Sequence, residues 1–156
     1  MQVRSEQEAL YLACEMEATA IQLYKRAMRL MENQGRAHEP LYARLALMLG
    51  DEEEHLRQFR SLYHGLDAAE EQRLTLSAVA EGVLFEGGLM GAVRQGLLGD
   101  AESMLRFASQ AEETSAAKYR EFASLAKDDR ARSALLMIAR EEEKHLDELR
   151  QQNGEL

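Results

Sequence analysis

The chain has one cysteine, Cys14, one proline, Pro40, and no tryptophan among its 156 residues. A single cysteine excludes an internal disulfide and a cysteine-based zinc or iron–sulfur site. The scarcity of proline, together with abundant Ala, Leu, Glu, Arg and Met, favours long uninterrupted helices. The composition therefore predicts an all-α protein.

Positive charge and long apolar runs are also scarce. Lys and Arg number 19 against 28 Asp and Glu, which gives a formal net charge of −9. Nucleic-acid affinity comes mainly from cations that neutralise phosphates, so we expect no nucleic-acid partner. No apolar run approaches the roughly 20 residues of a membrane span, and the first residues lack the pattern of a signal peptide. We therefore expect a cytoplasmic protein that does not bind membranes.

Length and hydrophobic content predict one domain over residues 1–156, because a chain of this size can bury one continuous core. Apolar residues recur with a helical period in four long segments, namely residues 5–32, 39–64, 101–127 and 130–152. Rods of that length are typical of helical bundles. The expected architecture is a four-helix bundle.

The four segments pair into two helical hairpins. Gly35 and Pro40 mark a short turn between the first two segments, since glycine often follows a helix and proline suits a first helical turn. Asp128 lies in the turn between the last two segments and can cap the helix that follows. We predict hairpins at residues 5–64 and 101–152.

The segment between the hairpins, residues 65–99, carries too many scattered glycines for a bundle helix to be predicted there. Its length suits a long crossover that runs along the bundle, with one or two turns of helix within it. Apolar residues such as Val83, Leu84 and Phe85 indicate that this crossover packs against another element.

The two hairpins are internal repeats. An offset of 95 residues aligns their first helices, and an offset of 90 aligns their second helices, with the difference falling in a turn, where insertions are tolerated. The aligned pairs that carry polar chemistry are Glu17 with Glu112, Tyr24 with Tyr119, Glu52 with Glu142 and His55 with His145.

Each second helix carries a Glu-x-x-His motif, at Glu52 with His55 and at Glu142 with His145. Three residues advance an α-helix by about 300°, so both side chains project from one face and can share a metal ion. One such motif on a charged helix is more typical of a solvated surface. Two copies on matching apolar stripes indicate a buried site.

Glutamates interrupt all four apolar stripes, as Glu52 does between Met48 and Phe59. Buried carboxylates without counter-charge are costly, and two divalent cations would balance four of them. Oxygen and nitrogen donors suit iron, manganese or zinc. The predicted metal ligands are Glu17, Glu52, His55, Glu112, Glu142 and His145.

Tyr24 and Tyr119 each follow a predicted ligand by seven residues, two turns along the same face. Core packing is one role for them, and a hydrogen bond that orients a metal-bound carboxylate is another. Cys14, one turn before Glu17, is interpreted as a small buried residue. The solvated sides of the helices are expected to carry Glu53, Glu54, Glu141 and Glu143.

These motifs resemble those of the rubrerythrin branch of the ferritin-like superfamily. Two Glu-x6-Tyr and two Glu-x-x-His motifs occur in family order, and the stretches ACEMEATAIQLY and AREEEKH look especially like it. The resemblance covers most of the chain and implies two iron ions. It implies that Glu52 and Glu142 bridge the ions, that Glu17 and Glu112 are terminal ligands, and that His55 and His145 bind one ion each.

By the same resemblance, the chain would be a di-iron oxidoreductase that reacts ferrous iron with hydrogen peroxide or dioxygen, and it would form a homodimer. The chain departs from the family at Ser109, where an additional carboxylate is usual, and it lacks the rubredoxin-like domain with its cysteine pairs. Electrons would therefore come from a separate donor, such as a rubredoxin-like protein.

Two other functions suit the same residues. A ferroxidase would use the site to oxidise ferrous iron for storage in an oligomeric shell. A non-catalytic helical bundle would bind zinc or no metal there. Particle mass and metal analysis separate these alternatives.

Overall fold

The computed structural model describes residues 3–85, 88–94, 96 and 99–152. No strand occurs in these ranges, so the prediction of an all-α fold is confirmed. The helices are α1 (Glu6–Asn33), α2 (Pro40–Leu62), α3 (Ala68–Ala80), α4 (Gly88–Arg94), α5 (Ala101–Ala123) and α6 (Asp129–Gln152).

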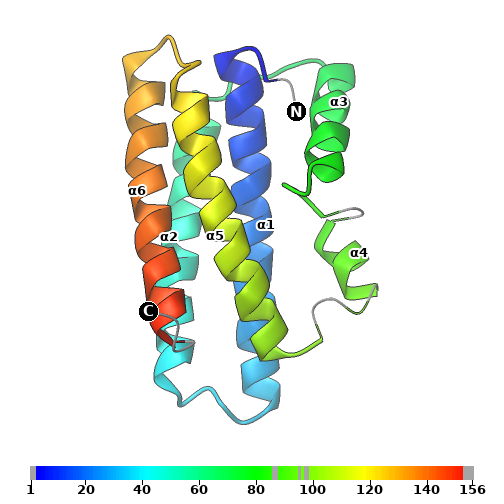
Figure 1. Ribbon diagram of the computed structural model, residues 1–156, viewed down its shortest axis with the longest axis vertical. Helices are drawn as coiled ribbons and strands as arrows, with labels where there is room; N and C mark the ends of the chain where they lie inside the picture. Colours follow the sequence, from blue (N-terminus) through cyan, green and yellow to red (C-terminus); the bar gives the residue numbers. More distant parts are fainter. Residues whose placement is uncertain (1–2, 86–87, 95, 97–98, 153–156) are drawn as a thin grey trace.

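Four long helices, α1, α2, α5 and α6, form the bundle (Figure 1). The helix α1 packs against α2 and α5, and α6 packs against α5 and α2, so the four close into a ring. Their 23 to 28 residues make rods of about 35 to 42 Å. None of the helices that the structure describes combines the length and apolar character needed to cross a membrane.

The helix ends follow from local residues. The Ser5 hydroxyl accepts a hydrogen bond from the Glu8 amide at 3.2 Å, and an Asp100 carboxylate oxygen accepts one from the Ser103 amide at 2.7 Å. These caps satisfy amides that have no partner inside the helix. Gly35 follows α1 with φ +70°, a backbone conformation that favours glycine, as predicted for this turn.

The crossover lies along α1, where both α3 and α4 contact that helix (Figure 1). With 13 residues, α3 is longer than the one or two turns expected within the crossover. The Asp67 carboxylate caps its first turn, and Leu74 and Ala78 are fully buried. The expectation was wrong because it rested on the scattered glycines of the whole crossover. None of them lies within α3, which ends before Gly82.

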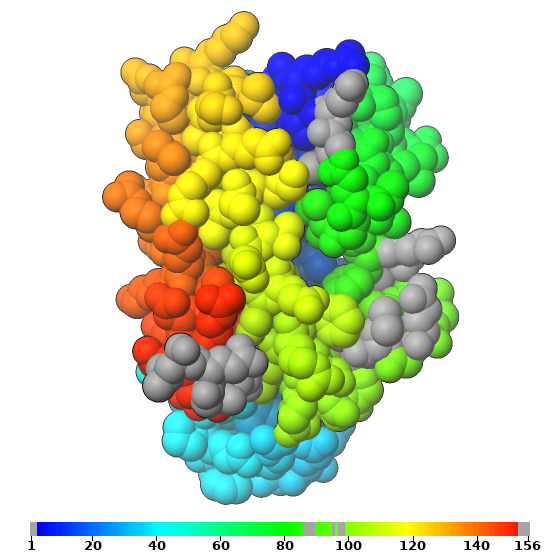
Figure 2. Space-filling view, viewed as in Figure 1, coloured from blue at the N-terminus to red at the C-terminus, as the bar shows by residue number. Residues whose placement is uncertain are grey.

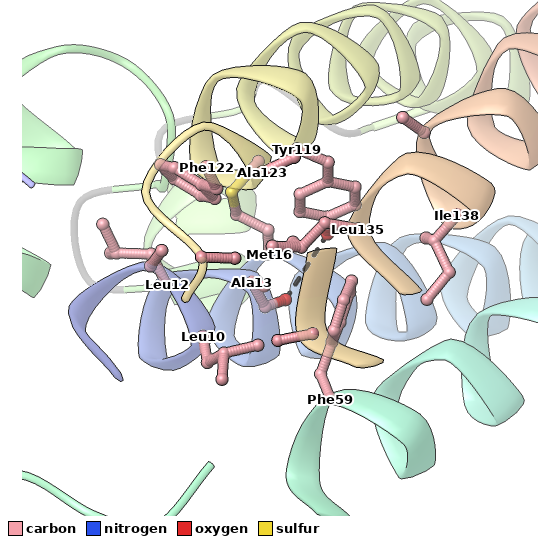
Figure 3. Close-up of a cluster of buried hydrophobic side chains, with 14 of the residues drawn as sticks. Leu10, Leu12, Ala13, Met16, Phe59, Tyr119, Phe122, Ala123, Leu135 and Ile138 are labelled. Atoms are coloured by element: carbon pink, nitrogen blue, oxygen red, sulfur yellow. Dashed lines mark hydrogen bonds between the residues drawn. The ribbon is translucent and has the colours of Figure 1, made fainter. Parts of the chain in front are cut away.

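Two apolar clusters form the core, one toward each end of the bundle. The first contains Phe59 and Tyr119, whose ring centroids lie 5.1 Å apart in an edge-to-face arrangement (Figure 3). The second contains Tyr24 and Leu45. Along α1, the first cluster ends at Met16 and the second begins at Ala20. Glu17 therefore lies in a polar layer between two apolar ones.

The second cluster yields a stability prediction with an internal control. Leu45 is fully buried on α2, whereas Leu47 on the same helix is 67% exposed. We expect Leu45→Ala to lower the free energy of unfolding by about 2–5 kcal/mol, because it leaves a cavity. Leu47→Ala should change it by about 0.5 kcal/mol or less. Urea unfolding measures both, and equal losses would contradict the assigned core.

Candidate metal centre

All six predicted ligands converge in the polar layer between the two apolar clusters. Two helices, α1 and α5, contribute one carboxylate each, while α2 and α6 contribute a carboxylate and an imidazole each. None of the six is more than 2% exposed: Glu17, Glu52, His55, Glu112, Glu142 and His145.

Packing of the apolar stripes turns these polar side chains inward. On α2, Met48 and Phe59 are at most 1% exposed, and Glu52 lies between them at helical spacing. Ile138 and Leu149 bracket Glu142 on α6 in the same way. The helices cannot bury these stripes without burying the carboxylates as well.

The side chains form two overlapping groups. One consists of Glu17, Glu52, His55 and Glu142, and in each group the potential ligand atoms lie within 4.8 Å of one another. The other consists of Glu52, Glu112, Glu142 and His145. Because both groups include Glu52 and Glu142, these two carboxylates occupy the position of bridges between two cation sites.

The imidazoles face the shared carboxylates of the opposite helix. His55 Nδ1 lies 2.8 Å from Glu142 Oε1, and His145 Nδ1 lies 2.8 Å from Glu52 Oε1. The two rings stack with their centroids 6.1 Å apart. Both Nδ1 atoms therefore point into the site.

The opposite ring nitrogens contact acids that the sequence analysis did not assign to the site. His55 Nε2 contacts Glu141, and His145 Nε2 lies 2.9 Å from Asp51 Oδ2. An Nε2–H that donates to a carboxylate fixes the ring and leaves Nδ1 free to bind a metal. Glu141 is 47% exposed, on the solvated side as predicted, but it also orients His55.

A sequence signal for these acids existed. Asp51 and Glu141 each precede the glutamate of a Glu-x-x-His motif, and the offset of 90 residues aligns them. Both helices therefore repeat an acid at this position. The signal carried little weight because acids are common on exposed helix faces.

The tyrosines bond crosswise between α1 and α5. The Tyr24 hydroxyl donates to Glu112 Oε1, and the Tyr119 hydroxyl donates to Glu17 Oε1 at 2.9 Å. Each is at most 1% exposed. The two roles that the sequence left open, core packing and a hydrogen bond to a predicted ligand, therefore occur together.

Mutual repulsion and burial shift the pKa values of the site. Burial, followed by the charges of Glu112 and Glu17, raises the pKa of Glu52 well above its usual value, and the same causes act on Glu142. Burial disfavours a charged His145, but Glu112 and Asp51 outweigh it and raise its pKa to about 9. The layer therefore favours added positive charge, as protons or metal ions.

Unpartnered polar atoms show that the residues suit a pair of cations. The described part of the chain holds eight buried side-chain nitrogen or oxygen atoms without a hydrogen-bond partner, and seven belong to the six predicted ligands. Buried polar atoms are rarely left unpartnered, because desolvation is costly. Carboxylate oxygens and imidazole nitrogens fit divalent iron, manganese or zinc.

The eighth unpartnered atom is the Oγ atom of Ser109, one turn before Glu112. The offset of 95 residues aligns Ser109 with Cys14, which is half-buried one turn before Glu17. Burial raises the pKa of the Cys14 thiol to about 11, so it stays protonated at neutral pH. Neither position carries an additional carboxylate.

The sequence model of a family described as "Ferritin-like domain" matches residues 5–155. No curated protein and no solved structure matches the chain.

The raised pKa values predict an unusual pH dependence for the metal-free protein. The folded state keeps protons on Glu52 and Glu142 that the unfolded chain releases above pH 4.5, and on His145 that it releases above pH 6.5. The stability from these groups is present at low pH and is lost as pH rises. We expect the melting temperature of the metal-free protein to fall between roughly pH 5 and pH 8.

Calorimetry across that range measures this fall. Saturating metal should abolish it, since cations replace the protons. Glu52→Gln should flatten the profile, whereas Glu53→Gln, on the exposed side of α2, should leave it unchanged. A melting temperature that rises with pH would contradict the proposed repulsion.

A second prediction concerns the acids that orient the imidazoles. Asp51→Ala removes the partner of His145 Nε2 and should weaken metal binding by about 10- to 100-fold. Glu53→Ala, an exposed acid two residues away, is the control. Competition with a chelator of known affinity measures both variants, and equal affinities would mean that Asp51 has no such role.

Proposed function

Because the chain belongs to the ferritin-like domain family, we propose that it is a di-iron oxidoreductase of the rubrerythrin type that reduces hydrogen peroxide or dioxygen. The observation that supports this most is the sharing of Glu52 and Glu142 by two four-residue groups. Shared carboxylates hold two cations close together, where both can act on one small oxidant. When bound, two ferrous ions would supply one electron each, the pair that reduces a peroxide.

The protein's own residues would hold and orient the centre. Glu17 and Glu112 would be terminal ligands, each fixed by a tyrosine hydroxyl from the other helix. Burial and the charge of Glu112 raise the pKa of Tyr24 well above its usual value, so the phenol keeps its proton and stays a donor. The apolar clusters on both sides would exclude water from the layer.

Electrons for turnover would come from another protein. The chain has one cysteine, so it carries no rubredoxin-like iron site of its own. A small external donor, such as a rubredoxin-like protein, would restore the ferrous state after each cycle. We propose a homodimer as the working assembly.

Iron oxidation for storage is the second candidate, and one feature favours it. A cleft of about 320 Å³ between α2 and α6 is lined by the acids Asp51, Glu141 and Glu148, by the bases Arg44 and Lys144, and by His145. Asp51 and Glu141, the acids that contact the two histidines, lie at its inner end and would attract a cation there. Such a cleft suits ferrous iron that enters as a substrate.

Metal stoichiometry tests the centre directly. We expect the protein to bind two ferrous ions per chain, and Glu52→Ala or Glu142→Ala to abolish binding of the pair because each removes a shared carboxylate. Glu53→Ala and Glu143→Ala are matched controls from the same helices and should bind two. Equal losses in all four variants would mean that the wrong helix face has been assigned.

Reaction of the ferrous protein then separates the functions. Stopped-flow spectroscopy with hydrogen peroxide and with dioxygen, followed by reduction and a second cycle, should show repeated turnover. A cage of many subunits that accumulates far more than two irons per chain would instead favour storage. A chain that binds no stoichiometric metal would be a non-catalytic bundle.

A further inference from the structure

A cavity of about 300 Å³ lies between α1, α5 and the crossover. Figure 2 shows a hollow between α5 and the crossover, with α1 visible at its floor. Its wall on the crossover side is the stretch from Gly82 to Phe85. The cavity lies on the side of the bundle opposite the cleft between α2 and α6.

Two residues that line this cavity lie close to predicted ligands along their own helices. Met16, which lines it from α1, directly precedes Glu17 in the chain. Ser115, which lines it from α5, is 6% exposed and follows Glu112 by one helical turn, about 4.5 Å along the axis. Ala111 also lines it, so short side chains form much of the α5 wall.

The lining is mostly uncharged. Met16, Val83, Leu84, Phe85 and Phe107 supply apolar surface, and the last two rings pack edge to face with centroids 5.6 Å apart. Thr19, Thr114 and Ser115 supply hydroxyls and Gln110 supplies an amide, so polar groups line the cavity as well. Glu113 is the one charged side chain among the described lining residues, and Arg150 lies 3.6 Å from its carboxylate. A neutral ligand with an apolar body suits this lining.

The cavity exceeds what hydrogen peroxide needs. A water molecule takes about 30 Å³ in the liquid, and hydrogen peroxide has only one more heavy atom. A volume of about 300 Å³ falls within the range of pockets that bind organic molecules. A small oxidant would therefore leave most of that volume unfilled.

We propose that this cavity binds the organic group of an alkyl or aryl hydroperoxide, with the peroxide end directed to the floor beside Glu17 and Glu112. This rests on the proposed function and names its substrate class. The reaction is ROOH + 2 e⁻ + 2 H⁺ → ROH + H₂O, in which the O–O bond breaks. The two electrons would come from a bound ferrous pair, which the proposed donor protein would reduce again.

A filled cavity provides the kinetic test. Ala111→Phe places a ring in the cavity from α5, and Ala117→Phe makes the same substitution at an exposed position of that helix. We expect Ala111→Phe to lower kcat/KM for cumene hydroperoxide about tenfold or more, while hydrogen peroxide changes little. Ala117→Phe should resemble the parent protein with both. Equal loss of both activities in Ala111→Phe would contradict a site for the organic group.

Ligand binding without turnover provides an independent readout. Cumyl alcohol, the product of that reaction, can be titrated into protein loaded with zinc, which is redox-inactive. We expect NMR shifts at methyl groups of Val83, Leu84 and Thr114, lost in Ala111→Phe and kept in Ala117→Phe. Shifts elsewhere, or none, would overturn the proposal.

The two measurements distinguish failure of the inference from failure of the proposed function. Reduction of hydrogen peroxide with no binding of cumyl alcohol in the cavity would overturn the substrate class and leave the oxidoreductase intact. Binding of the alcohol without reduction of either peroxide would overturn both, and the cavity would then be a site for neutral amphiphiles.

Discussion

Repulsion among four buried carboxylates is the constraint on which this structure depends. Glu17, Glu52, Glu112 and Glu142 share one layer of the bundle and are nearly excluded from water. Their negative charge cannot remain uncompensated at that depth. Protons, held by the raised pKa values of Glu52 and Glu142, are one solution, and a pair of cations is the other. The folded protein is therefore stable only when protons or cations neutralise part of the charge in this layer.

Each hairpin supplies hydrogen-bond partners for buried polar side chains of the other hairpin. Tyr24 bonds the glutamate of α5, and Tyr119 bonds the glutamate of α1. The imidazoles cross in the same way, since His55 reaches acids of α6 and His145 reaches acids of α2. Neither hairpin alone satisfies its own polar groups. This mutual dependence ties assembly of the bundle to formation of the site.

The two faces of the bundle offer different chemistry to the same centre. Between α2 and α6, three acids and two bases surround the approach to His145. Between α1, α5 and the crossover, apolar side chains and hydroxyls suit a neutral organic molecule. The crossover creates this difference, because it covers α1, and no segment that the structure describes covers α2 and α6 in the same way. The proposed metal loading and the proposed substrate binding would then use separate routes.

The amino-acid sequence alone determined the four bundle helices and the inward direction of the six predicted ligands. A helical period is a local property, so the phase of Glu52 and His55 relative to Met48 and Phe59 identified their face before any packing was known. The tertiary structure decided the rest: which tyrosine bonds which glutamate, that Asp51 and Glu141 orient the imidazoles, and where the cavity lies. These features depend on which helices are neighbours and at what height they meet, and periodicity along one helix carries no information about either.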